Sequence, residues 1–219
     1  RSNFSVLTAR FVFLFMFDYF SVVARKNPAA LIDAYTRAFE PSDGAALVLK
    51  SINGSARPRD VAALHAAAAG RPDVIFVDDY LSPDDHAAML GACDAYVSLH
   101  RSEGLGLTMA EAMALGKPVI ATGYSGNLEF MTDDVAFLVD STLVPIGPGV
   151  DPYPAEARWA DPDTAHAAAL MWKVFDDRAH AAEVGRRASE LIRAGWSVDR
   201  VGRALSEKVE QARERPRDP

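Results

Sequence analysis

The feature that most constrains the fold is a regular alternation of short apolar runs with segments of helical pattern. The runs are apolar on both faces of the pleat and occupy residues 11–17, 45–49, 74–77, 95–99, 119–121 and 136–139. Such strands are typical of a parallel sheet whose two faces are covered by helices. Helical patterns lie between them at about 28–39, 59–69, 83–92 and 107–115. The sequence therefore predicts an open α/β sheet of Rossmann type, which binds ligands beyond the carboxyl ends of its strands.

The pattern changes after residue 139. Residues 140–161 contain four prolines and two glycines, which predicts a long structured loop. Ala-rich helical patterns follow at about 162–175, 178–194 and 198–212, and we expect these helices to pack on the sheet. Asn27 and Ser82 are predicted helix N-caps. The expected organisation is a linker or fragment start at 1–10, one Rossmann-like domain at 11–212 and a tail at 213–219.

The composition excludes several classes of function. With 23 Lys and Arg against 30 Asp and Glu, the formal net charge is −7, which argues against a surface for nucleic acid or an anionic membrane. The single cysteine, Cys93, cannot form an internal disulfide, which fits a reducing compartment. The longest apolar run is far shorter than the roughly 20 residues of a membrane span. We therefore expect a cytoplasmic protein that meets anionic ligands through a local cluster of cations.

The most informative segment begins at Glu103, directly after a predicted strand. Gly104, Leu105 and Gly106 make a tight turn, and a helix opens at Leu107. The glycines let the backbone approach a ligand closely, and the free N–H groups of a first helical turn favour an anion such as a diphosphate. A purely structural turn would also explain two glycines at this spacing.

The helix at 107–115 is apolar on every side, so we expect it to be buried, with Glu111 as its lone charge. A buried carboxylate is costly unless it is paired or hydrogen-bonded, and the hydroxyl groups of a ligand could meet that need. The dinucleotide-binding motif would require a third glycine where Met109 stands. An NAD site is therefore not predicted.

The segment from Glu103 to Glu111, E-G-L-G-L-T-M-A-E, continues as A-M-A-L-G-K-P-V-I-A-T, and G-N-L-E-F follows at Gly126. Together these residues resemble the E-x7-E signature of retaining GT-B glycosyltransferases, more narrowly of the family-4 group. The resemblance extends from about residue 11 to 205 and implies the C-terminal, donor-binding half of a GT-B fold. It also implies that Glu103 lies beside the donor sugar, that Glu111 binds the ribose, and that residues 104–107 hold the diphosphate.

A second polar cluster follows the first predicted strand: Ser21, Arg25, Lys26, Asn27 and Pro28. Adjacent cations ahead of a helix at this edge of a sheet are placed to meet a phosphate, although they could also be an ordinary solvated pair. The resemblance assigns a phosphate-binding lysine to Lys26. Ser21 stands where the family has an arginine, so Arg25 is the candidate to replace it. Lys-Asn-Pro before an apolar helix resembles the branch that acts on polysaccharides or glycans.

Five further residues lie near the predicted carboxyl edge of the sheet. Lys50 could reach the site or extend to solvent. Tyr80 and Leu81 belong to a segment that resembles the base-binding segment of relatives, and the same segment could simply begin a helix. His100 either contacts the ligand or has a structural role. Arg101 either pairs with the negative charge of the donor or neutralises Glu103.

The expected function is transfer of a hexose from a nucleotide diphosphate sugar to a glycan or another acceptor hydroxyl. Glu103, Lys26 and Arg25 are the candidate catalytic residues. The five histidines are scattered, so no metal site and no cofactor are predicted. A non-catalytic nucleotide-sugar binding module is the main alternative, and another GT-B enzyme such as a phosphorylase or an epimerase is a third.

The length adds one expectation. A GT-B enzyme has two Rossmann-like domains, and 219 residues supply one at roughly 150–200 residues per domain. The chain alone is thus expected to bind a donor without catalysing transfer. The acceptor would bind mainly to an N-terminal domain, and any peripheral membrane contact would be made through that domain.

Overall fold

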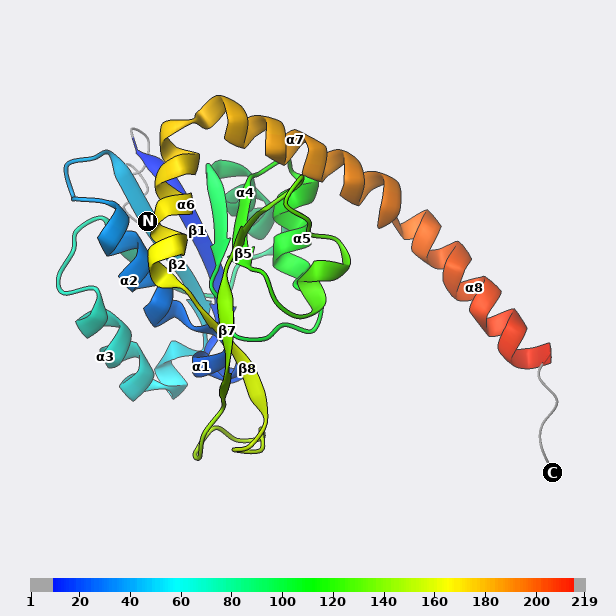
Figure 1. The fold of residues 1–219 in the computed structure, drawn as a ribbon, viewed down its shortest axis with the longest axis horizontal. Helices are drawn as coiled ribbons and strands as arrows, with labels where there is room; N and C mark the ends of the chain where they lie inside the picture. The colour runs from blue at the N-terminus through cyan, green and yellow to red at the C-terminus, as the bar shows by residue number, and fades with distance from the viewer. Residues whose placement is uncertain (1–9, 215–219) are drawn as a thin grey trace.

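A six-stranded parallel sheet organises the computed structural model, which describes residues 10–214 (Figure 1). The strands, in the spatial order β3-β2-β1-β4-β5-β6, are β3 (Val74–Asp78), β2 (Ala45–Ile52), β1 (Phe11–Asp18), β4 (Ala95–Ser98), β5 (Val119–Thr122) and β6 (Phe137–Val139). All neighbouring pairs in this sheet are parallel, which confirms the fold class predicted from the apolar runs. β1 is buried along its length except at Asp18, because helices cover both of its faces.

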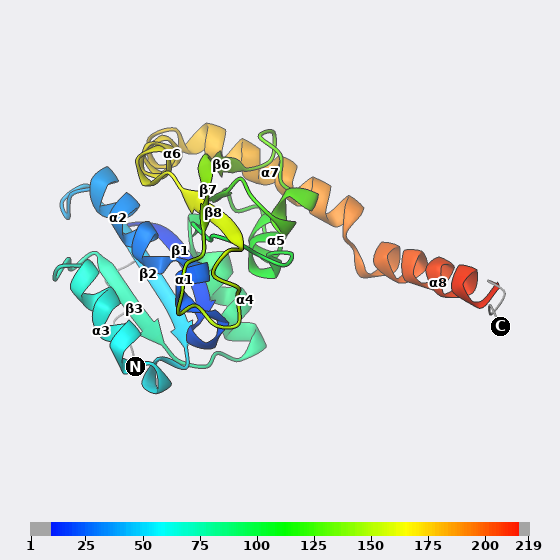
Figure 2. The same ribbon diagram turned by 60° about the horizontal axis from the view of Figure 1, so that its bottom comes forward.

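Helices flank both faces of the sheet (Figure 2). They are α1 (Val23–Lys26), α2 (Pro28–Ala38), α3 (Pro58–Ala67), α4 (Pro83–Ala92), α5 (Leu107–Ala114), α6 (Thr164–Asp176), α7 (Arg178–Gly195) and α8 (Val198–Glu214), with 3₁₀ turns at Tyr19–Ser21, Gly54–Ala56 and Gly126–Glu129. α2 contacts α3 and α6 on one face, whereas α5 contacts α4 and α7 on the other. No described helix has the length and apolar character needed to cross a membrane.

The core lies between these helices and the sheet. Phe13 of β1 is fully buried and lies 6.3 Å from the Tyr35 ring and 5.4 Å from the Phe39 ring, centroid to centroid. Each large apolar side chain buried in this way contributes about 1.5–3 kcal/mol. β1 and β4 pair in parallel, with Phe13 opposite Ala95, so their carboxyl ends lie side by side and position the loops that follow them.

The two predicted helix caps have different outcomes. The Ser82 hydroxyl accepts the backbone N–H of Asp85 at 3.1 Å, which confirms Ser82 as the N-cap of α4. Asn27 has a left-handed backbone (φ 56°), and its side-chain amide donates to the Leu99 carbonyl at 3.0 Å. Asn27 is thus the N-cap residue of α2 by position, as predicted, but its side chain makes no capping hydrogen bond, because the buried amide instead joins the end of α1 to the end of β4.

Residues 140–161 are not a loop throughout. β7 (Ser141–Pro145) pairs antiparallel with β8 (Arg158–Pro162), and the hairpin extends from the carboxyl edge of the sheet (Figure 1). The sequence concealed it because β7 is largely exposed and therefore lacks the apolar alternation of a half-buried strand.

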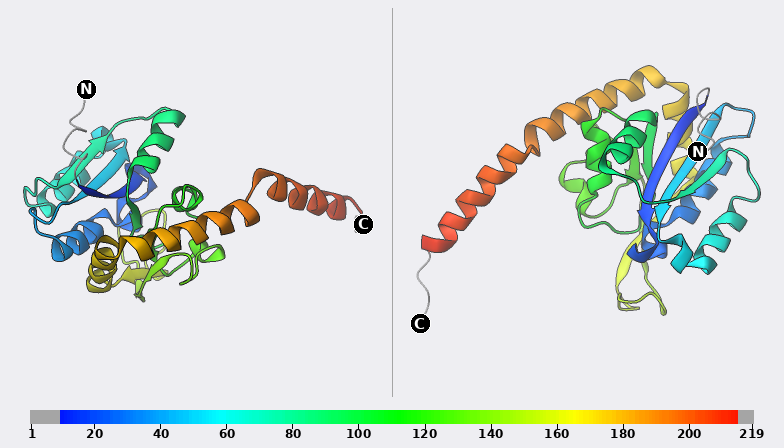
Figure 3. Two further views of the ribbon diagram at one scale, coloured as in Figure 1. Left: turned by 90° about the horizontal axis from the view of Figure 1, so that it is seen from above. Right: turned by 180° about the vertical axis from the view of Figure 1, so that it is seen from behind.

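The C-terminal helices differ in their packing. α6 contacts β5 and β6 of the sheet, as expected, and also packs on α2, whereas α7 packs on α5. α8 instead projects from the body, and its residues 199–213 are exposed (Figure 3). The predicted start at 1–10 and tail at 213–219 fall almost wholly outside the described residues.

Candidate functional site

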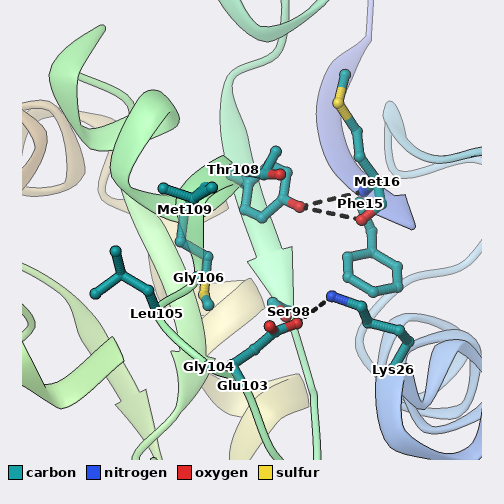
Figure 4. A pocket seen from close by; sticks show the side chains of 12 residues that line it. Phe15, Met16, Lys26, Ser98, Glu103, Gly104, Leu105, Gly106, Thr108 and Met109 are labelled. Carbon is teal, nitrogen blue, oxygen red and sulfur yellow. Dashed lines mark hydrogen bonds and ion pairs between the residues drawn. The ribbon is translucent and has the colours of Figure 1, made fainter. Parts of the chain in front are cut away.

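A cavity of about 280 Å³ opens at the carboxyl edge of the sheet, beside the ends of β1 and β4 (Figure 4). These neighbouring strands lead into helices on opposite faces, which is where ligands enter an open α/β sheet. The lining residues come from β1, α1, β4, the loop between β4 and α5, and the start of α5: Phe15, Met16, Lys26, Tyr96, Ser98, Glu103, Gly104, Leu105, Gly106, Leu107, Thr108 and Met109. The predicted glutamate, glycine turn and lysine are thus brought together.

Glu103 lies between two cations. The Lys26 ammonium pairs with Glu103 Oε1, and Arg25 Nη1 lies 3.4 Å from Oε2. The three side chains are only 12–17% exposed, so Arg25 and Lys26 are not an ordinary solvated pair. Burial alone raises the pKa of Glu103, but the hydrogen bond from Lys26 and the charges of Lys26 and Arg25 outweigh it and hold the pKa below its usual value. Glu103 is therefore anionic, and the cluster carries one net positive charge.

The short helix α1 sets the direction of both cations. Arg25 Nε donates to the Ser21 carbonyl at 3.1 Å, and Arg25 Nη1 donates to the Ser102 carbonyl at 2.8 Å. Ser21 therefore contributes a backbone carbonyl that orients Arg25. Val22, which precedes α1, has φ 61°, a strained conformation for a β-branched residue. The surrounding contacts hold this turn against its local preference.

The glycine turn brings α5 to the cavity with its N-terminus first. Gly106 has φ 86°, which a residue with a side chain rarely adopts, and it immediately precedes α5. Leu107, Thr108 and Met109 form the first turn of α5 and line the cavity. Their backbone N–H groups have no partner within the helix, so this wall of the cavity favours an anion.

Ser125 and Gly126 support the glutamate from behind and were not predicted as site residues. The Ser125 hydroxyl accepts the Glu103 N–H at 2.8 Å, and the Gly126 N–H donates to the Glu103 carbonyl at 3.2 Å. A Cβ atom on Gly126 would overlap the carbonyl oxygen of Gly104, so only glycine fits. The usable signal in the sequence was Ser-Gly-Asn at residues 125–127, a few residues after the predicted strand at 119–121.

His100 does not face the cavity. It is fully buried, with Nδ1 3.0 Å from the Ser98 hydroxyl and Nε2 3.1 Å from both the Tyr124 carbonyl and Asn127 Oδ1. We assign the ring proton to Nε2, because a carbonyl only accepts. Burial lowers the pKa of His100, and its hydrogen bonds only partly offset this. In this geometry the imidazole is neutral and structural. It joins the glutamate segment, residues 99–106, to residues 124–127 after β5.

The expectation that α5 is buried on every side is wrong. The side chains that face the core are Met109, Ala112 and Met113, whereas Leu107 is 67% exposed and Leu115 46%. Glu111 lies on the open face with a 53% exposed side chain, and its Oε2 accepts from His86 Nε2 of α4 at 3.0 Å. The carboxylate is thus accessible to a ligand one helical turn beyond the cavity, and it needs no ligand to offset burial.

Lys50 follows neither predicted alternative. Its ammonium is buried beneath the end of β2 and donates to the carbonyls of Ser51 at 2.9 Å and Asp79 at 2.6 Å. Burial lowers the pKa of Lys50, which nearby Asp78 and Asp79 partly offset. Lys50 therefore anchors the segment that leads from β3 to α4.

Tyr80 and Leu81 lie at the start of α4, away from the cavity described above. Tyr80 is 70% exposed, and its hydroxyl donates to Asn53 Oδ1 at 2.6 Å. Leu81 lines a separate, mainly apolar cavity of about 710 Å³ between α4 and the sheet.

Across residues 10–214, no three His, Cys, Asp or Glu side chains gather so as to hold a metal ion.

An open parallel sheet with cations, a carboxylate and a helix N-terminus at its switch point defines a domain suited to a phosphorylated ligand. Residues 16–144, more than half of the chain, match the family described as glycosyl transferases group 1. The chain belongs to this family. None of the curated proteins matches it.

Solved structures share the fold. HepE of Anabaena, in complex with UDP and glucose, is 18% identical with a TM-score of 0.75, and the alignment covers 96% of this chain and 53% of HepE. The pneumococcal O-GlcNAc transferase GtfA, in complex with UDP and GlcNAc, is 16% identical (TM-score 0.67; 94% and 37% covered). The C-terminal domain of the group 1 protein LpcC of Francisella tularensis is 16% identical (0.63; 85% and 86%). The fold is thus the Rossmann-like domain of GT-B glycosyltransferases, and the chain spans about half the length of HepE.

Proposed function

We propose that this chain is the donor-binding domain of a retaining glycosyltransferase, which moves a hexose from a nucleoside diphosphate sugar to a hydroxyl of a glycan or another acceptor. The observation that carries the proposal is the placement of Glu103, Lys26 and Arg25 beside the N-terminus of α5 at the switch point of the sheet. Family membership supports it, as do fold neighbours bound to UDP.

In this proposal each part of the site meets one part of the donor. Lys26, Arg25 and the first N–H groups of α5 bind the diphosphate, because they combine positive charge with unpaired donors. Glu111, exposed beside the cavity, accepts hydrogen bonds from the ribose hydroxyls. The base lies toward Tyr80 and Leu81 at the start of α4.

The reaction requires stabilisation of a departing diphosphate while positive charge grows at the anomeric carbon. Lys26 and Arg25 stabilise the negative charge that develops on the diphosphate, which is a form of electrostatic catalysis. When the phosphates engage the cations, the Glu103 carboxylate becomes free to accept from hydroxyls of the hexose and to orient it. No resident metal is proposed in this step, because the two cations and the helix N-terminus supply the positive charge.

The acceptor and the completed active site are assigned to a second domain of the full-length protein, so the chain alone is proposed to bind the donor without transferring the sugar. We further propose that the protein acts in the cytoplasm. In the full-length protein, the anomeric configuration of the product, read by NMR, tests retention directly.

A thermal-shift panel of UDP-, GDP- and ADP-sugars tests donor binding by the chain. A ligand at 100 times its Kd stabilises the folded state by about 2.7 kcal/mol, so one nucleotide class should raise the Tm. Lys26→Met should remove most of that shift, whereas Lys208→Met on the exposed helix α8 provides the matched control. A chain that none of the three classes stabilises would contradict the proposal.

A further inference from the structure

Arg101 joins the β7–β8 hairpin to the carboxyl edge of the sheet, where the candidate site lies. The family match ends at residue 144, within β7, so most of the hairpin lies outside the matched region. The hairpin nevertheless begins directly at the carboxyl end of β6 and lies beside the glutamate segment, residues 99–106. The contacts between the hairpin and this segment show how the hairpin can act on the site.

On the hairpin side, Arg101 makes three contacts with β8. Its carbonyl accepts the Ala160 N–H at 2.9 Å, and its Nη2 donates to Asp161 Oδ1 at 2.8 Å. The guanidinium carbon lies 5.2 Å from the ring centroid of Trp159, which is 2% exposed. The Arg101 side chain is thus directed to the hairpin, and the described ion pairs of Glu103 are with Arg25 and Lys26 instead of Arg101.

On the opposite side, Arg101 contacts the helix that carries the two cations. Its backbone N–H donates to the Arg25 carbonyl at 2.8 Å, and Arg25 Nη1 donates in return to the Ser102 carbonyl at 2.8 Å. The Arg25 carbonyl belongs to the last turn of α1, where helical carbonyls lack partners within the helix. Residue 101 therefore links β8 to the end of α1, from which Arg25 and Lys26 extend.

We infer that Arg101 is a positioning residue for diphosphate binding: it fastens the β7–β8 hairpin to the glutamate segment and so holds the end of α1 in place. The inference rests on the proposed function. Arg101 and Asp161 are 28% and 47% exposed, so their ion pair contributes little to folding by itself. The ion pair between Arg101 and Asp161 instead affects ligand binding. A cation that is not held in place must be ordered when the ligand binds, and this ordering lowers the affinity.

The test compares Arg101→Met with Arg158→Met in the full chain. Arg158 is the matched control, because it lies on β8 and its guanidinium donates only within the hairpin, to the Leu143 carbonyl, among the contacts described. Affinities for UDP and for uridine are measured by isothermal titration, with uridine by displacement. Arg101→Met should weaken UDP binding by about 5- to 20-fold while uridine changes less than about twofold, and Arg158→Met should change both less than about twofold.

Asp161→Ala provides a second variant, because its exposed side chain can be removed without unfolding the hairpin. It should act in the same direction as Arg101→Met, with a smaller loss. Unchanged UDP affinity in Arg101→Met, an equal loss for uridine, or an equal loss in Arg158→Met would overturn the inference while leaving donor binding intact. Where the thermal-shift panel selects another base, the same comparison uses GDP with guanosine or ADP with adenosine. A wild-type chain that binds none of UDP, GDP and ADP would refute the proposed function, and this inference with it.

Discussion

Replacing Glu103 with glutamine should strengthen the binding of UDP even though it should abolish sugar transfer. In the unliganded site, Glu103 occupies both cations that are proposed to receive the diphosphate. UDP lacks the donor hexose whose hydroxyls are proposed to bind the Glu103 carboxylate, yet its phosphates must still displace that carboxylate from Lys26 and Arg25. Glutamine keeps the size and a hydrogen-bonding group but removes the competing charge.

The magnitude follows from the geometry. Two unit charges 3.4 Å apart, the distance between Arg25 Nη1 and Glu103 Oε2, attract by about 5 kcal/mol at an effective dielectric constant of about 20. This is a gross figure, because water reaches side chains that are 12–17% exposed and salt screens them. Only a fraction of this attraction opposes UDP binding, because the phosphates replace part of the pairing between the cations and Glu103. A net gain of about 1 kcal/mol corresponds to roughly fivefold tighter binding.

Isothermal titration of UDP into the wild-type chain and Glu103→Gln, at low and high salt, measures the effect. The gain should shrink at high salt, because it is electrostatic. Glu207→Gln on the exposed helix α8 removes the same charge far from the cavity and should leave the affinity unchanged (Figure 3). Equal or weaker UDP binding by Glu103→Gln would refute the competition between Glu103 and the diphosphate.

Three further predictions follow from individual contacts. Gly126→Ala should weaken UDP binding at least tenfold in calorimetry, or about 1.4 kcal/mol, because the new methyl group overlaps the Gly104 carbonyl and displaces the turn. Glu111→Gln should weaken UDP binding but not that of 2′,3′-dideoxy-UDP, and equal losses would contradict its contact with the ribose. Asp73→Asn should cost about 3–5 kcal/mol of unfolding free energy at neutral pH in urea denaturation, because Asp73 is 1% exposed and paired with Arg71. Burial raises the pKa of Asp73, but the bonds from Arg71 and its other partners outweigh it and place the pKa below the ordinary value. The stabilisation it gives is therefore present above about pH 4 and is lost as pH falls through the folded-state pKa, so wild type and variant should converge in acid.

The sheet could be predicted because strands that are buried on both faces are apolar at consecutive positions, and this pattern is visible in the sequence. A strand such as β1 is apolar at consecutive positions, and the intervals between such runs leave room for crossover helices. The hairpin could not be predicted in this way. β7 and β8 satisfy their backbone groups by pairing with each other, and this requires little apolar patterning.

The candidate site was predictable where its parts are close in sequence and obscure where they are not. The glycine turn and its two flanking glutamates lie within nine residues, so their common role is visible in one segment. The pairing of Lys26 with Glu103 spans 77 positions, and only the topology of β1 and β4 brings the two together. The exposure of Glu111 was missed because two apolar residues of the predicted helix, Leu107 and Leu115, are themselves exposed, so the apolar pattern on every side does not mean burial on every side.

These features together explain how an acidic chain can present a cationic site. Two cations that are less than a fifth exposed would repel each other and lose hydration, unless a carboxylate accompanies them. Glu103 satisfies that requirement in the free protein, and the carbonyls of Ser21 and Ser102 hold Arg25 in place. In the proposed function, the diphosphate replaces one anion with another, so the site would not expose two unpaired cations. The same proposal has this exchange release Glu103 as a sugar hydroxyl arrives beside it, which would link donor recognition to the orientation of the hexose.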